Sequence, residues 1–352
     1  MDRFRTIFWA AAGLAVFTLA CGQDARPTVE SAAETSIEPA AGLTDRPTVG
    51  PTEQMPIVVL TIEPAVEIQV GSSIYEIESI WGNTPVSGVS FASPNGIAID
   101  RFDNVYVNEC RGNRVQKFSP DGVLLTGWGS AGTENGQFRN PTGIAIDGEG
   151  NVYVSESGNH RVQKFTSEGE WLASWGSRGA GDGEFLSAMV IAVDAEGTLY
   201  VSDWGNGRIQ VFDSSGNYLG EIGYGGTGDG ELTTPTGVKV DRAGNLWVVD
   251  RGNDRVQKFT RDGEFLVAWG SLGFDPGQFR VPTSIAIDDE GNFYVAEVDN
   301  SRVQIFSSTG EYIAELAPGL LTRPHGLAFD SKGNLYVADT GNDSVKKFRL
   351  GN

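Results

Sequence analysis

The residues able to do acid–base or metal chemistry are few in this chain. Among its 352 residues are two histidines, His160 and His325, and two cysteines. A catalytic zinc site takes three protein ligands, often several of them imidazoles, so we expect no metal, and no other cofactor is indicated. His325, in a Pro-His-Gly sequence, leaves catalysis open only in combination with an acid such as Glu109 or Glu156.

Acidic residues recur at a fixed place along the chain, and in five of six cases an arginine follows five positions later. One interpretation is an ion pair that braces a turn, and the other is a ring of carboxylates that collects cations. Repetition favours the ion pair, because ligand sites usually break the symmetry of a repeat. The acids are Glu109, Glu156, Asp203, Asp250, Glu297 and Asp339, followed by Arg114, Arg161, Arg208, Arg255, Arg302 and, in the sixth case, Ser344.

These acids belong to a long internal repeat. A Gly-Ile-Ala-Ile-Asp sequence or a relative of it ends at six aspartates, with spacings of 47, 47, 47, 47 and 42 residues. Within one unit, segments 143–147, 152–156, 161–165 and 171–175 are rich in β-branched and aromatic residues and are separated by Gly-containing turns. Four strands per 40–50 residues are typical of a propeller blade. The aspartates are Asp100, Asp147, Asp194, Asp241, Asp288 and Asp330.

The same spacing predicts how the ring closes. Trp81 precedes Trp128 by 47 residues, so segment 74–81 corresponds to a fourth strand with no strands before it. The sixth unit ends before its own fourth strand, and we expect segment 74–81 to complete that blade. The fold class is therefore all-β, a six-bladed propeller over residues 57–352, in which the place of residues 57–70 stays open. Its 47 glycines fit the many turns.

The repeat resembles a known family. The pattern Pro-x-Gly-Ile-Ala-x-Asp, then Gly-Asn-x-Tyr-Val-x-Asp/Glu, then Asn-x-Arg-Val-Gln-x-Phe is similar to NHL repeats, and six copies cover residues 93–352. The resemblance implies a six-bladed propeller but no single function, since one fold serves many sites. Some relatives are peptide-amidating lyases with a zinc held by several histidines, and streptogramin-lyase-like propellers use a catalytic histidine with acids.

The first residues read as an export signal. Arg3 and Arg5 precede a short apolar run that ends in small residues at position 20, which predicts a signal peptide over 1–20. Cys21 follows, in a context that resembles the bacterial lipobox, so we expect lipidation of Cys21; the alternative is ordinary cleavage that leaves an unmodified thiol. Residues 21–56 then form a Pro/Thr/Glu-rich tether. The expected location is the cell envelope, membrane-anchored and facing the periplasm or the exterior.

The loops between the fourth strand of one blade and the first of the next share a face with the turns between second and third strands. Loops on a rigid scaffold commonly carry binding, and residues that break the repeat there mark a candidate binding face: Arg111, Trp204, Arg251, Asp299 and His325. We expect a non-enzymatic module that binds a protein or a glycan. The alternatives are a lyase or hydrolase with a metal near His325, and a ligand-sensing ectodomain with a separate signalling partner. A formal charge of −20 argues against nucleic acid.

Overall fold

The computed structural model describes residues 67–70, 73–82 and 89–350, all of which belong to the compact unit Val59–Asn352. The predictions for residues 1–56, including the signal peptide and the lipidation of Cys21, lie outside the described residues. No helix in the described part is long and apolar enough to cross a membrane.

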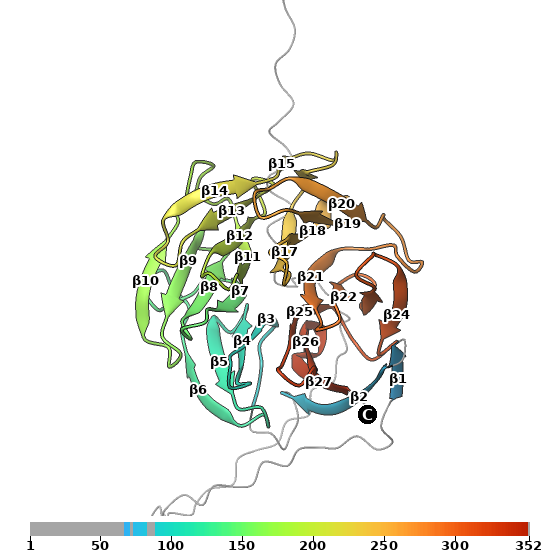
Figure 1. The fold of residues 1–352 in the computed structure, drawn as a ribbon. Coiled ribbons are helices and arrows are strands. Elements are labelled where there is room, and N and C mark those ends of the chain that lie inside the picture. The colour runs from blue at the N-terminus through green and yellow to red at the C-terminus, as the bar shows by residue number, and fades with distance from the viewer. Residues whose placement is uncertain (1–66, 71–72, 83–88, 351–352) are drawn as a thin grey trace, which may run out of the picture. The chain divides into compact units, whose positions relative to one another are not determined.

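Six antiparallel sheets surround a central axis (Figure 1). Each sheet places the first strand of its repeat innermost, next to the first strands of the two neighbouring blades. From blade one to blade six the innermost strands are β3 (Pro94–Ile99), β7 (Pro141–Ile146), β11 (Ala188–Val193), β17 (Pro235–Val240), β21 (Pro282–Ile287) and β25 (Pro324–Phe329).

The second and third strands of each blade follow outward, and in blades one to five a fourth strand forms the rim. The second strands are β4 (Val105–Glu109), β8 (Val152–Glu156), β12 (Leu199–Asp203), β18 (Leu246–Asp250), β22 (Phe293–Glu297) and β26 (Leu335–Asp339). The third strands are β5 (Arg114–Phe118), β9 (Arg161–Phe165), β13 (Arg208–Phe212), β19 (Arg255–Phe259), β23 (Arg302–Phe306) and β27 (Ser344–Leu350). The rim strands are β6 (Leu124–Trp128), β10 (Trp171–Trp175), β14 (Tyr218–Ile222), β20 (Phe265–Trp269) and β24 (Tyr312–Leu316).

The sixth sheet holds five strands from both ends of the described chain, in the order β1-β2-β27-β26-β25. Strand β2 (Ser73–Trp81) contains the segment expected to complete this blade, and it pairs antiparallel with β27. Strand β1 (Glu67–Val70) adds an outer strand beyond β2, so the described end of segment 57–70, whose place the sequence left open, extends this sheet. Blade six is thus assembled from residues nearly 280 positions apart, such as Tyr75 and Leu350.

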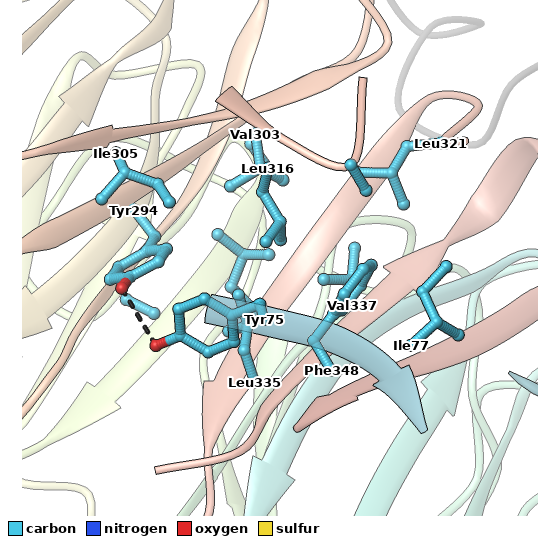
Figure 2. Close-up of a cluster of buried hydrophobic side chains, with 14 residues drawn as sticks. Tyr75, Ile77, Tyr294, Val303, Ile305, Leu316, Leu321, Leu335, Val337 and Phe348 are labelled. Carbon is cyan, nitrogen blue, oxygen red and sulfur yellow. Dashed lines mark hydrogen bonds between the residues drawn. The ribbon is translucent and has the colours of Figure 1, made fainter. Parts of the chain in front are cut away.

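Side chains on β2 join the core between blades five and six. In Figure 2, Tyr75 and Ile77 lie among Leu316, Val337 and Phe348, and a hydrogen bond of 3.1 Å links the hydroxyls of Tyr75 and Tyr294. Equivalent clusters fill each interface between neighbouring blades, and the repeating Tyr and Phe residues pack in them.

One apolar position of the repeat escaped the sequence reading. It lies in the loop that leads to each innermost strand, where a large apolar side chain is buried in the hydrophobic core. Its members are Phe91, Phe138, Phe185, Leu232, Phe279 and Leu321.

The repeated aspartate after each innermost strand organises the next turn. In blade two, Asp147 Oδ1 accepts the backbone N–H groups of Glu149 and Asn151, and Asp147 Oδ2 accepts a hydrogen bond of 2.9 Å from the hydroxyl of Tyr153. Gly150 adopts a φ of +90° in this turn, a conformation that glycine tolerates without strain. The recurrent Asp is therefore a turn residue.

The innermost strands pack backbone against backbone around the axis. A Cβ on Gly143 would lie 2.6 Å from the carbonyl oxygen of Met189 on the next innermost strand, so only glycine permits this approach. Beside it, the hydroxyl of Thr142 donates to the same carbonyl over 2.9 Å. Close packing of this kind fixes where side chains near the axis emerge.

Candidate functional site

The repeated acid–arginine pairs are buried braces. In blade five, Glu297 has no exposed surface, and its Oε1 accepts hydrogen bonds from Arg302 Nε over 2.6 Å and Gln304 Nε2 over 2.7 Å. Its Oε2 accepts from the backbone N–H of Arg280 and from the Asn300 amide. The prediction of an ion pair is confirmed in the five blades that carry the arginine, by Arg114–Glu109, Arg161–Glu156, Arg208–Asp203, Arg255–Asp250 and Arg302–Glu297.

Blade six replaces the brace by another pair. Ser344 cannot carry charge, and Asp339 instead pairs with Lys346, which lies two residues further along β27. Because all six carboxylates are fully buried and bonded to side chains of their own blade, the structure favours bracing over a ring that collects cations. Burial raises the pKa of Glu156, Asp203 and Glu297 even though the arginines act in the opposite direction.

Charges of a different kind lie where the innermost strands begin, a region we call the channel mouth. Two sets of residues meet there: the residue after each brace carboxylate and the residue before each innermost strand. The first set is Cys110, Ser157, Trp204, Arg251, Val298 and Thr340, and the second is Ser93, Asn140, Ser187, Thr234, Val281 and Arg323. Only blades four and six place a charge here, through Arg251 and Arg323.

Arg251 and Arg323 lie within electrostatic range of His325. The His325 ring makes a 3.0 Å hydrogen bond through Nδ1 to the carbonyl oxygen of Arg323. Burial and the two guanidinium groups lower the pKa of His325 to about 4, so its imidazole is neutral at pH 7. Since a carbonyl can only accept, Nδ1 carries the proton and Nε2 presents a lone pair.

Arg251 is a half-buried cation without a direct anionic partner among the described residues. Burial lowers its pKa, and Asp299 and Asp254 oppose this shift from a distance. Within residues 67–70, 73–82 and 89–350, no hydrogen bond or ion pair of its guanidinium is found. Asp299 lies instead 3.9 Å from Arg280 Nη2, on the exposed side of the turn. A cation in this state attracts an anionic group more strongly than an exposed arginine does.

The structure gathers only part of the predicted binding face. Arg251, Asp299 and His325 lie in blades four, five and six and interact electrostatically. Arg111 is exposed on blade one, which lies across the ring from blade four. Trp204 is half-buried rather than exposed, and its indole N–H is buried without a partner among the described residues.

Arg323 was missed by the sequence reading, although it is the one charged residue in the set before the innermost strands. A comparison of that set alone would have found it. The second histidine, His160, is half-buried, and burial lowers its pKa. It lies in blade two, away from the arginine pair of blades four and six.

Comparison with protein families identifies the repeat. A model for the NHL repeat matches residues 138–165, 279–306 and 321–348, and each match spans the first three strands of one blade. A model described as a 6-bladed beta-propeller matches residues 194–265. The chain is an NHL-repeat six-bladed β-propeller. No curated protein matches this NHL propeller.

Solved structures share the fold at low identity. A streptogramin B lyase matches with 17% identity and a TM-score of 0.56, over 79% of this chain and 87% of the other. A catalytically inactive virginiamycin B lyase from Staphylococcus aureus, with quinupristin, gives 16% and 0.57 over 84% and 98%. A gluconolactonase from Xanthomonas campestris gives 16% and 0.61 over 84% and 98%. These similarities establish the propeller architecture; at this identity they do not transfer an activity.

The surroundings of His325 do not favour the binding of a metal ion. In the described ranges, no group of three or more His, Cys, Asp or Glu is arranged to hold a metal ion. The charged groups that act on His325 are two arginines, which repel a divalent cation. The channel mouth is chemically suited to an anion.

Proposed function

We propose that this NHL propeller is a binding module that takes an acidic sugar residue of a glycan at the channel mouth. The observation that carries the proposal is Arg251, a half-buried guanidinium with no direct partner among the described residues, within electrostatic range of the neutral imidazole of His325. A cation that is partly removed from water and has no partner is destabilised, so an anion that binds at the mouth gains a favourable electrostatic interaction.

Arg251 and His325 would bind different atoms of one ligand. A guanidinium presents parallel N–H donors that match a carboxylate. His325 Nε2 offers a lone pair, because its Nδ1 proton is engaged with Arg323. A carboxylate with a neighbouring hydroxyl satisfies both, and uronic acids carry this combination. A plain acidic peptide offers carboxylates without the regular adjacent hydroxyl, which is why we place the glycan first.

The experiment is calorimetric titration of the purified propeller with an oligogalacturonate, with a neutral oligosaccharide of equal length and with a poly-glutamate peptide. We expect binding of the uronate alone and at least a tenfold weaker affinity for Arg251→Ala. The matched control is Arg242→Ala, because Arg242 is exposed and paired with Asp289 in the turn at the opposite end of its strand. Equal affinity for the neutral sugar, or full binding by Arg251→Ala, would contradict the proposal; peptide binding would move it to a protein partner.

A catalytic propeller is the second candidate, and His325 is the observation that favours it. A neutral imidazole with an available lone pair can act as a general base. Turnover of a lactone by the wild type that is lost in His325→Asn and retained in Arg242→Ala would establish catalysis. The absence of turnover together with uronate binding would leave the binding module.

We further propose that the propeller is held at a membrane through a lipid on Cys21. The support is the sequence alone: an apolar run, the cysteine and the Pro-rich segment that follows. Detergent partitioning of the full chain expressed in bacteria tests it. Wild type is expected in the detergent phase and Cys21→Ala in the aqueous phase, and equal partitioning would refute the anchor.

A further inference from the structure

Phe274 departs from the repeat in the loop that joins β20 of blade four to β21 of blade five. It precedes the buried Phe279 by five positions, and the loops that lead to blades two, three and four have Thr133, Ala180 and Thr227 in this place. Short side chains therefore suffice to build such a loop. The phenyl ring of Phe274 is an addition to it.

The ring of Phe274 packs on a guanidinium instead of joining the core. The Cζ atom of Arg280 lies 4.8 Å from the ring centroid, and 66% of Phe274 is exposed. A cation over one face of an aromatic ring is attracted to it, which orients the ring while most of its surface meets solvent. Leu272, in the same loop, is exposed as well, so the loop presents an apolar surface beside a positive charge.

The backbone that carries Phe274 is fixed by the brace of blade five. Arg302 Nη1 donates a hydrogen bond of 2.8 Å to the carbonyl oxygen of Phe274, and Arg302 Nη2 donates over 2.8 Å to that of Gln278. Arg302 is itself paired with the buried Glu297. Because the loop is already ordered, a ligand that packs on Phe274 pays little to order it.

Asp299 connects this loop with the channel mouth. Its carboxylate lies 3.9 Å from Arg280 Nη2, and its charge also acts on Arg251. Two guanidinium groups are therefore within electrostatic range of one carboxylate. Arg251 lies at the channel mouth, and Arg280 lies against the ring of Phe274.

We propose that Phe274 and Arg280 form a second subsite, where the sugar residue next to the one bound by Arg251 stacks on the phenyl ring. This inference rests on the proposed acidic-sugar site and makes its ligand a chain of at least two uronic acid residues. The C–H groups on one face of a sugar ring suit the negative face of an aromatic ring. The charge of Arg280 favours an acidic sugar over a neutral one, and Asp299 can accept hydrogen bonds from sugar hydroxyls.

The test is calorimetric titration of the purified full chain with galacturonic acid and with trigalacturonate. We expect the wild type to bind the trimer about five to ten times more tightly than the monomer, which is the range that one aromatic contact supplies. Phe274→Thr installs the residue found in two of the other loops, and with it the trimer should bind no more tightly than the monomer. Phe274→Tyr keeps an aromatic ring and should keep the gain.

Phe102 offers a matched control. It is also 66% exposed, and its ring centroid lies 4.8 Å from Arg101 Cζ. It follows the end of β3, whereas the channel mouth lies where the innermost strands begin. Phe102→Thr should therefore keep the gain from monomer to trimer, and both threonine variants should keep the melting temperature of the wild type.

The outcomes separate this inference from the proposed function. Equal binding of monomer and trimer by the wild type, a gain that persists in Phe274→Thr, or an equal loss of the gain in Phe102→Thr would overturn the second subsite. In each of these cases, monomer binding that is lost in Arg251→Ala would still support the acidic-sugar site. Failure of the wild type to bind either ligand would overturn both proposals.

Discussion

The propeller contains two sets of charged residues that differ in every physical respect. The brace carboxylates recur in each blade, are fully buried and are paired within their own sheet. Arg251 and Arg323 occur once each where the innermost strands begin, and Arg251 has no direct counter-ion among the described residues. The first set serves stability, because each carboxylate satisfies several donors at once. The second set is the one to which we assign ligand binding in our proposal.

The largest effect is expected from a brace. Glu297→Ala leaves Arg302, Gln304 and the backbone N–H of Arg280 without their buried acceptor. Removing one partner of a buried pair costs about 3–5 kcal/mol, and we expect a loss of this size in the free energy of unfolding measured by urea denaturation. A loss below about 1 kcal/mol would show that a brace contributes no more to the free energy of unfolding than a surface ion pair does.

An intermediate effect is expected from His325, and it depends on pH. The pKa of His325 is about 4 in the folded chain and about 6.5 in the unfolded chain, so below pH 6.5 the unfolded chain binds the additional proton. The stabilising effect of neutral His325 is complete above pH 6.5 and is lost as the pH falls towards 4, by about 3 kcal/mol in all.

The measurement is the difference between wild type and His325→Asn across pH 4 to 7.5, which removes the contributions that both proteins share, including those of Glu156 and Glu297. The advantage of the wild type should decrease as the pH falls. A difference that stays constant would show that burial and the charges of Arg251 and Arg323 do not lower the pKa of His325.

The smallest effect on stability is expected at Arg251. Arg251→Met keeps an aliphatic chain of similar length and removes a charge that has no direct partner. The free energy of unfolding should change by less than about 1 kcal/mol or rise slightly, while uronate binding is lost. Destabilisation as large as that of Glu297→Ala would show that Arg251 stabilises the fold as the brace carboxylates do. The distinction between the two sets of charged residues would then be wrong.

The fold could be predicted almost completely, because the same pattern of strand and turn residues recurs six times in the sequence. Periodic Asp, Gly-Asn and Tyr residues determine the turns, and the acid–arginine spacing determined the braces before any coordinate was known. The site was predicted only in part. Residues that break the repeat could be picked out from the sequence, and Arg251, Asp299 and His325 do interact. Arg111 and Trp204 also depart from the repeat, but they do not interact with these three residues.

The sequence by itself determined the elements of this NHL propeller, since strand patterning and turn chemistry are local properties. Only the tertiary structure determined which of the residues that depart from the repeat interact with one another. Arg251 and Arg323 are 72 positions apart, and both act on His325 because the ring brings blades four and six to one mouth. Closure around an axis, a long-range property, turns isolated departures from a repeat into a candidate site.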